Sequence, residues 1–201
     1  MHDFGLDDVS SAIQWHPECE FIRKLGQDFL HFIAIFTIVG ENWKESNDTY
    51  LSLPTAYKYS LPNLRKQETL YTIGKSATRC LMIGNRLCHS FLILLMSNPD
   101  LTIDCLDIDN PVVEYLNRQF NNRIRRYTGG DGYDLVHIDV DIPKASNALE
   151  TYIPCAERGK YVMINEHKHH HNAIQSYIER GNLVWVSSCE SAMVTVRNLH
   201  K

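Results

Sequence analysis

The segment from residue 79 to residue 109 constrains the fold of this 201-residue chain more than any other part of the sequence. It begins with a short apolar run that ends on a glycine, CLMIG at 80–84, and it ends with LTIDCLDID at 101–109. Between these runs, residues 89–97 have the length and apolar composition of a short helix. A strand that ends in a glycine turn, a helix that begins there, and a second strand with a terminal carboxylate form a nucleotide-binding βαβ unit. The segment therefore predicts a parallel sheet and a nucleotide-like ligand.

Length, composition and charge restrict the class of protein. With 44% hydrophobic and 22% charged residues, the chain is expected to form one globular domain, or one domain with an elaborated terminus. The net charge of −4 argues against a nucleic-acid or anionic-membrane partner. We interpret a local cluster of arginines as the solvated face and end of a helix. These arginines are Arg118, Arg123, Arg125 and Arg126. A homo-oligomer remains open.

The cysteines and the apolar runs indicate a soluble cytoplasmic protein. The six cysteines are scattered without a C-x-x-C pair, and Cys80 and Cys105 fall inside predicted buried strands. Free thiols in a reducing compartment are therefore expected. The acidic, polar N-terminus is unlike a signal peptide, and the longest apolar run, residues 29–39, is shorter than the ~20 residues of a membrane span.

The chain divides into two regions. Residues 1–78 are predicted to form an N-terminal helical cap or leader, with helices at 18–39 and 63–75. Residues 79–201 alternate between strands and helices, which predicts an α/β fold. The expected strands are 79–83, 101–107, a brief one within 125–131, 133–139, 160–165, 182–187 and 191–198, and helices are expected at 89–97, from 111 with an apolar face reaching Ile124, from 143 and at 172–180. The last two strands should pair as an antiparallel hairpin. The fold class is thus a Rossmann-like doubly wound sheet with a C-terminal antiparallel hairpin.

From about residue 62 onward, the chain resembles the class I S-adenosylmethionine-dependent methyltransferases, especially the small-molecule O-methyltransferases. The matching segments are LMIGNRLCHSFLILL at 81–95, LDID at 106–109, YDLVHID at 133–139 and YVMINEH at 161–167. The closing hairpin agrees with the reversed seventh strand of that family. The resemblance implies a Rossmann-like methyltransferase core over residues 79–201 and S-adenosylmethionine as the cofactor.

The resemblance also implies a set of cofactor-binding residues. Glycine at the end of the first strand lets the backbone approach the methionine part of the cofactor. Helix N–H groups bind its carboxylate, and an acidic residue after the second strand accepts hydrogen bonds from the ribose. In TGGDG at 128–132, the aspartate matches the family's adenine contact. The implied residues are Gly84, Asn85, His89, Ser90, Asp107, Asp109 and Asp131, with Asp107 favoured for the ribose and Asp109 for a helix cap.

Two departures from the family pattern affect this site. The glycine turn keeps one of its usual glycines, because Asn85 and Arg86 stand at the flexible positions. The region of the third strand is short and runs almost directly into the fourth strand, which leaves little room for the usual helix between them. Both departures affect how the cofactor is held, and the second one affects adenine recognition most.

Methyl transfer needs alignment of the reactants and deprotonation of the acceptor. Enzymes that resemble catechol O-methyltransferase lower the pKa of the acceptor hydroxyl with a divalent cation, and the matching positions here are Asp139, Asn165 and Glu166. These are the oxygen donors that Mg²⁺ prefers. Alternatively, Asp139 caps the next helix, and Asn165 and Glu166 form a turn. Asp139 and His167 are the candidate catalytic residues, with His167 as a general base.

The remaining histidines point to structural roles. Histidines 167, 169, 170 and 171 are nearly consecutive, so their side chains should point in divergent directions and not form one tetrahedral zinc site. His137 lies inside the fourth predicted strand, where we expect a structural histidine with satisfied hydrogen bonds.

The sequence thus favours a methyltransferase that acts on an oxygen of a small-molecule or sugar-like acceptor, with or without the help of Mg²⁺ or another divalent cation. The alternative is a catalytically inactive methyltransferase-like module for binding or assembly, which the depleted glycine turn and the short third-strand region support. A Rossmann-type NAD-binding protein is disfavoured by the terminal hairpin and by the missing glycines.

Overall fold

The structure is a computed structural model, and it describes residues 61–84, 89–106, 108–109, 111–139, 142–165, 170–189 and 192–198. The predicted helix at 18–39 and most of the N-terminal cap lie outside these residues. The chain divides into two compact units, Met1–Leu64 and Arg65–Lys201, and the second unit holds the fold described here. Within the described residues, no helix has both the length and the apolar composition needed to cross a membrane.

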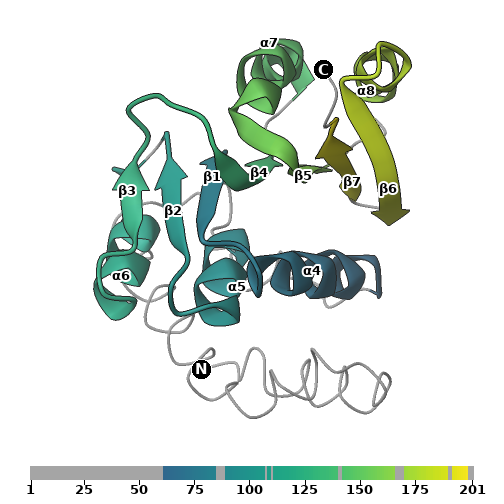
Figure 1. Cartoon of the computed structure of the whole chain (residues 1–201). Helices are drawn as coiled ribbons and strands as arrows, with labels where there is room; N and C mark the ends of the chain where they lie inside the picture. The colour runs from purple at the N-terminus through teal and green to yellow at the C-terminus, as the bar shows by residue number, and fades with distance from the viewer. Residues whose placement is uncertain are drawn as a thin grey trace. The chain divides into compact units, whose positions relative to one another are not determined.

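The core of the second unit is a seven-stranded sheet with the strand order β3-β2-β1-β4-β5-β7-β6 (Figure 1). The first five strands are parallel, and β7 is inserted antiparallel between β5 and β6. The bounds are β1 (Arg79–Ile83), β2 (Thr102–Cys105), β3 (Ile124–Arg126), β4 (Tyr133–Ile138), β5 (Ala156–Asn165), β6 (Leu183–Cys189) and β7 (Ala192–Arg197). The predicted doubly wound sheet with a C-terminal antiparallel hairpin is confirmed.

Helices lie on both faces of this sheet, as Figure 1 shows. On one face are α4 (Leu61–Gly74), α5 (His89–Ser97) and α6 (Pro111–Gln119), and on the other are α7 (Ile142–Tyr152), which continues into a short 3₁₀ turn (Ile153–Cys155), and α8 (His171–Glu179). In β1, Leu81 and Ile83 join the core beneath α7 and α8, whereas Cys80 and Met82 are buried on the opposite side. A strand buried on both faces is apolar at nearly every position, which explains the run CLMI.

Helices α4 and α5 approach each other closely at Gly74. A Cβ atom at this position would collide with the Oγ atom of Ser97 and would crowd Leu94. Glycine here therefore permits the contact between the end of α4 and the last turn of α5.

The prediction that the arginine cluster forms the solvated face and end of a helix is wrong for most of its members, because Arg118 lies in α6, whereas Arg123 follows that helix and Arg125 and Arg126 belong to β3. Arg123 is half-buried, and its guanidinium donates hydrogen bonds to five backbone carbonyl oxygens. Those oxygens belong to Leu95 (2.6 Å), Asn98 (2.6 Å), Pro99 (2.9 Å), Leu101 (3.2 Å) and Phe120 (3.1 Å). Arg118 pairs with Glu114 one helical turn away, and Arg126 pairs with Asp109. Arg123 thus satisfies the carbonyls at the end of α5, which lack partners inside the helix.

The prediction that the apolar face of α6 reaches Ile124 is wrong, because α6 ends at Gln119 and Ile124 is the first residue of β3. The cause is a left-handed turn at Asn121 and Asn122, both with φ of 57°. Asparagine tolerates this conformation better than most residues. The Asn122 N–H donates to the carbonyl oxygen of Asn117, which closes the helix.

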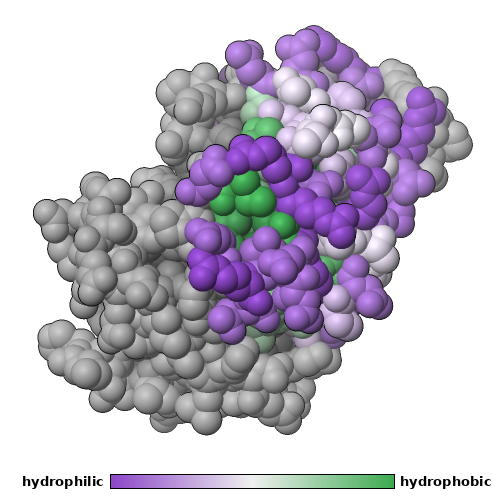
Figure 2. Space-filling view, turned by 90° about the vertical axis from the view of Figure 1, so that its left-hand side faces the viewer, coloured by the Kyte–Doolittle hydropathy of each residue, from purple (hydrophilic) through white to green (hydrophobic). Residues whose placement is uncertain are grey.

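The connection from β3 to β4 contains only residues 127–132 and no helix. It begins at the carboxyl end of β3, where the Tyr127 N–H donates to the Cys105 carbonyl oxygen, and it ends at the amino end of β4. Among the described residues, no helix lies over β2 and β3 on the face that α7 and α8 cover farther along the sheet (Figure 1). Figure 2 shows this end of the sheet, where hydrophilic residues surround a small apolar area.

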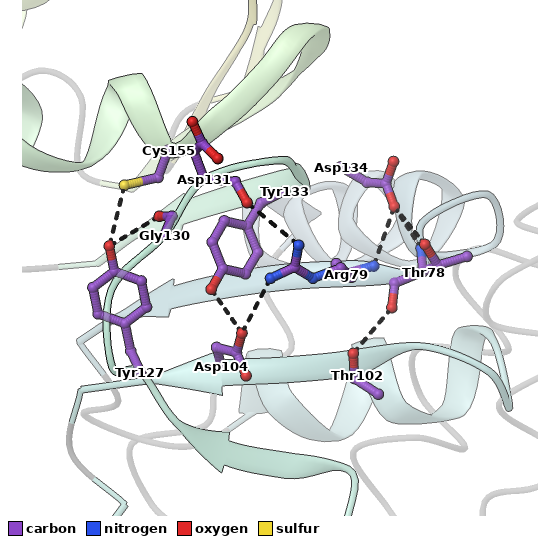
Figure 3. A network of polar contacts seen from close by, with 10 residues as sticks. All are labelled: Thr78, Arg79, Thr102, Asp104, Tyr127, Gly130, Asp131, Tyr133, Asp134 and Cys155. Atoms are coloured by element: carbon purple, nitrogen blue, oxygen red, sulfur yellow. Dashed lines mark hydrogen bonds and ion pairs between the residues drawn. The ribbon is translucent and has the colours of Figure 1, made fainter.

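A polar network fills the place of the missing helix (Figure 3). The Arg79 guanidinium lies 4.6 Å from the centre of the Tyr133 ring and donates to the carbonyl oxygen of Asp131. The Tyr133 hydroxyl donates to Asp104 at 2.7 Å. Burial and then this hydrogen bond raise the pKa of Tyr133 above its ordinary value. The network lies on the amino side of the sheet, where β1 and β4 begin.

Candidate functional site

The carboxyl ends of β1 and β4 meet at the point where the strand order reverses. The chain passes from β1 to β2 and β3 on one side of the sheet and then returns to β4 and β5 on the other. The Asp139 N–H donates to the Ile83 carbonyl oxygen at 2.8 Å, so Asp139 and Gly84 follow adjacent strand ends. In open α/β sheets, ligands bind in the crevice at this reversal. The structure thus brings two of the predicted site residues, Gly84 and Asp139, together at that position.

Gly84 has a backbone conformation that suits a close ligand approach. Its φ of +87° lies in the region that side chains other than glycine resist. Residues 85–88, which include the candidate Asn85, lie outside the described part of the chain.

Helix α5 begins at His89, as the sequence predicted, and the half-buried Ser90 lies in its first turn. Because the first N–H groups of a helix lack partners within it, this helix start can bind an anionic group. The side chain of His89 is not among those described.

The acidic end of β2 is described only in part. Asp107 lies outside the described residues, whereas Asp109 is exposed and pairs with Arg126, whose Nη2 atom lies 2.7 and 2.8 Å from the two carboxylate oxygens. Arg126 is the last residue of β3, so this pair joins the carboxyl ends of β2 and β3. A sequence motif gave no signal for this pairing, because the two residues are brought together only by the register of β2 and β3. Exposed pairs of this kind contribute little stability, so the pair can open for a ligand.

Asp131 is not brought together with Gly84, the described cofactor candidate at the end of β1. Its backbone carbonyl oxygen accepts a hydrogen bond from Arg79, the first residue of β1, and its side chain is exposed. Asp131 therefore lies near the amino ends of the strands, and Gly84 lies at their carboxyl ends. The cause is the short connection between β3 and β4. It leaves the carboxyl end of β3 and has already reached the amino ends of the strands at Asp131.

The ends of β4 and β5 carry a second group of polar residues. His137 is fully buried and Asn165 is 4% exposed, and Asp139 is half-buried. Neither ring nitrogen of His137 nor the Oδ1 atom of Asn165 has a hydrogen-bond partner among the described residues. His137 is thus buried within β4 as expected, but the expectation that its hydrogen bonds are satisfied is not met.

Burial lowers the pKa of His137 to about 4, although the charge of Asp139 and the nearby Asn165 amide act in the opposite direction. Lys66 of α4 also lowers this pKa, which places its positive charge near the same strand ends. No hydrogen bond of acceptable geometry joins the imidazole to the amide in this structure. His137 is therefore neutral at pH 7.

The metal candidates are described in part. Asp139 and Asn165 follow or end neighbouring strands and both offer oxygen atoms, and the buried Oδ1 atom of Asn165 lacks a partner among the described residues. These two residues fit the donor set of a hard divalent cation. Glu166 and His167 lie outside the described residues. Where the structure describes the chain, it contains no group of three or more His, Cys, Asp or Glu residues arranged to hold a metal.

The histidines that precede α8 differ in their surroundings. His170 is buried and His171 is exposed, so the side chains of these neighbours point in different directions. Histidines 167 and 169 lie outside the described residues, so the absence of a shared tetrahedral site stays a prediction.

Comparisons with known proteins identify the fold. No protein-family model matches the sequence, and no curated protein matches it either. Solved structures do match. An O-methyltransferase from Streptomyces achromogenes involved in tomaymycin synthesis, in complex with SAM, has a TM-score of 0.53 at 11% identity over 67% of this chain and 80% of its own. An O-methyltransferase from Bacillus cereus in complex with SAH gives 0.52 at 12% identity over 71% and 84%. A methyltransferase from Geobacter sulfurreducens gives 0.54 at 13% identity over 66% and 78%. The second unit therefore has the Rossmann-like fold of class I methyltransferases, as the sequence resemblance implied.

Proposed function

We propose that this chain is an S-adenosylmethionine-dependent methyltransferase that acts on an oxygen atom of a small-molecule or sugar-like acceptor. The observation that carries the proposal is the strand order, with β7 antiparallel between β5 and β6 and with Gly84 and Asp139 at the reversal point. The similarity to O-methyltransferases whose structures contain SAM or SAH supports the same choice of cofactor.

The residues that follow β1 and β2 bind the cofactor, and those that follow β4 and β5 act on the acceptor. Gly84 gives the backbone room for the methionine part of the cofactor, and the N–H groups at the start of α5 bind its carboxylate. Asp107 accepts hydrogen bonds from the ribose hydroxyls. Bound S-adenosylmethionine supplies an electrophilic methyl group. Asp139, which follows β4, and His167, which comes after β5 in the sequence, orient the acceptor and take its proton.

The proposal also includes a divalent cation that assists the transfer. Asp139 and Asn165, together with Glu166, would hold Mg²⁺ or a similar ion, which would lower the pKa of an acceptor hydroxyl. A cation-independent transfer uses the same acceptor position with His167 as the base.

A second function is favoured by a specific observation. Asp131 lies near the amino ends of the strands, so the adenine contact implied by the family resemblance is not available from this residue. A methyltransferase-like module that binds partners without catalysis would tolerate this loss. Cofactor affinity distinguishes the two functions.

Calorimetric titration of the full chain with S-adenosylmethionine and S-adenosylhomocysteine, with Mg²⁺ and with EDTA, tests the proposal. We expect binding that is weakened at least 10-fold in Asp107→Ala. Asp131→Ala is the matched control, because it removes a carboxylate near the amino ends of the strands. The cofactor affinity of this variant should remain unchanged. The absence of binding at millimolar concentration would refute the enzyme, and binding of NAD in its place would indicate a dinucleotide-binding protein.

The role of the cation is tested separately. If Asp139→Ala keeps the cofactor affinity but abolishes its dependence on Mg²⁺, the cation is assigned to the β4 and β5 side. Equal affinities with Mg²⁺ and with EDTA, together with equal methyl transfer, would remove the cation from the mechanism.

A further inference from the structure

His137 and Asn165 form a buried polar pair on one face of the sheet. His137 is in register with Met163 of β5, and Asn165 lies two residues farther along the same strand, so both side chains face the side that α4 and α5 cover. His137 is fully buried, and 4% of Asn165 is exposed. The pair lies where β4 and β5 end, next to the reversal point.

Both ring nitrogens of His137 and the Oδ1 atom of Asn165 lack hydrogen-bond partners among the described residues, which is unusual for buried groups. The imidazole offers one N–H donor and one lone pair in either neutral tautomer, and the amide offers its Oδ1 atom as an acceptor. All three groups are without a partner among the described residues. Because leaving such atoms unsatisfied costs free energy, a buried group of this kind indicates a missing partner.

The chemistry of the pair selects one kind of partner. A hydroxyl group can accept a hydrogen bond from the ring N–H and donate its own hydrogen to Asn165 Oδ1. An anion would accept from the ring, but the Oδ1 atom would repel it. An ammonium group would be a charge in a fully buried place, which is strongly unfavourable. A neutral group that both donates and accepts is the best match.

We propose that His137 and Asn165 together bind a single hydroxyl group, supplied either by the acceptor of the methyl transfer or by a buried water molecule. If the hydroxyl group belongs to the methyl acceptor, the inference rests on the proposed function. If it belongs to a buried water molecule, the inference is independent of that function. The pair lies two residues before Asp139 on β4 and at the end of β5, so a hydroxyl held there lies beside the proposed reaction centre. In that arrangement His137 is a residue that selects hydroxylated acceptors over apolar ones.

Nuclear magnetic resonance of the full chain with ¹⁵N-labelled histidine tests the proposal. The ring N–H of His137 is observed in the ligand-free protein, with phenol as a small hydroxyl probe, and with toluene as its hydroxyl-free analogue. The resonance is assigned by its loss in His137→Gln and its persistence in His171→Gln, which replaces an exposed histidine.

Three outcomes are distinguishable. A downfield N–H resonance with a through-space contact to water in the ligand-free protein supports the water source. A resonance that moves downfield with phenol, but not with toluene, supports the acceptor source. A resonance at the position of an N–H without a hydrogen-bond partner in all three samples overturns the proposal.

Variants separate binding from a purely structural role. Asn165→Leu removes the acceptor of the hydroxyl hydrogen, so the downfield shift should be lost. If phenol is the source, its dissociation constant should rise at least 10-fold in His137→Leu and stay within about 3-fold in His137→Gln, which restores a donor. Equal values in both variants would exclude selection by this residue. Cofactor titration on the same samples shows whether a failure concerns this pair or the methyltransferase itself.

Discussion

Removing the carboxylate of Asp134 should weaken the amino end of the sheet, where three strands begin. Its Oδ2 atom accepts hydrogen bonds from the Thr78 N–H (2.8 Å), the Thr78 hydroxyl (2.9 Å) and the Arg79 N–H (3.1 Å), as Figure 3 shows. Its Oδ1 atom lies 2.9 Å from the Lys160 ammonium of β5. One side chain therefore connects the start of β1 to β4 and β5.

The expected loss of folding stability can be estimated from these contacts. Hydrogen bonds to a charged group contribute about 1.5–3 kcal/mol each when buried, and about 1 kcal/mol each is reasonable at this partly exposed edge. The exposed pair with Lys160 adds about 0–1 kcal/mol. Asp134→Ala should therefore destabilise the protein by about 3 kcal/mol. Asp134→Asn keeps an acceptor oxygen but loses the charge, so about 1 kcal/mol is expected.

The same contacts make the stability depend on pH. Burial raises the pKa of Asp134, but the hydrogen bonds from Lys160, Thr78 and Arg79 outweigh it and lower the pKa from 3.8 to about 2. This difference corresponds to at most about 2.4 kcal/mol, and solvent screening reduces it to about 1–2 kcal/mol. Because the folded state has the lower pKa, this stabilisation is complete above about pH 5 and is lost as the pH falls toward 2.

Urea unfolding at a series of pH values between 7 and 3 measures both effects. The stability difference between the wild type and Asp134→Asn should shrink as the pH falls. Asp131→Asn replaces an exposed carboxylate in the loop just before β4 and should change stability by less than about 0.5 kcal/mol. A difference that stays constant from pH 7 to pH 3 would refute the assignment of this pKa to Asp134. A loss below about 1 kcal/mol in Asp134→Ala would refute the estimate of the hydrogen bonds.

Three further substitutions test other parts of the structure. Gly74→Ala should destabilise by about 1–3 kcal/mol through its collision with Ser97, and a double-mutant cycle with Ser97→Gly should recover most of that loss in chemical unfolding. Arg123→Met removes the guanidinium that donates to five carbonyl oxygens and should cost about 2–4 kcal/mol, although the Asn98 oxygen keeps the Leu101 N–H as a donor. Arg123→Lys should cost about half as much because an ammonium reaches fewer of these oxygens. Gly84→Ala forces a side chain into a φ of +87° and should lower stability by about 1–2 kcal/mol in thermal unfolding. Calorimetry should show at least 10-fold weaker cofactor binding for this variant, and unchanged affinity would remove Gly84 from the site.

Most of the fold could be predicted because local patterns agree with the final arrangement. The run CLMI forms β1 and the segment YDLVHI forms β4, since strands covered on both sides are apolar along most of their length. The end of α6 could not be placed in this way. Ile124 continues the helical spacing, but the left-handed turn at Asn121 and Asn122 depends on the backbone hydrogen bond to Asn117.

The site was predictable where a residue's position follows from its strand. Gly84 and Asp139 both follow parallel strands, so the sheet brings them together. Asp131 was assigned from a short motif, and its place depends on the path of the chain between β3 and β4, which no local pattern reveals. The missing partners of His137 are likewise a property of packing, because they depend on which atoms α4 and β5 bring near the imidazole.

Because the connection between β3 and β4 contains no helix, the two halves of the described sheet are covered differently. Around β4 and β5 the backbone amides lie between helices on both sides. Among the residues that the structure describes, β2 and β3 have α5 and α6 on one side and the polar residues around Arg79 and Asp104 on the other (Figure 1). Water therefore has a shorter route to the backbone amides of β2 and β3 than to those of β4 and β5. Amide hydrogens of β3 and α6 should exchange through local opening, well before those of β4 and β5, which exchange with global unfolding. The end of the sheet that carries the Asp109–Arg126 pair would then adjust its shape to a ligand while the acceptor side stays rigid.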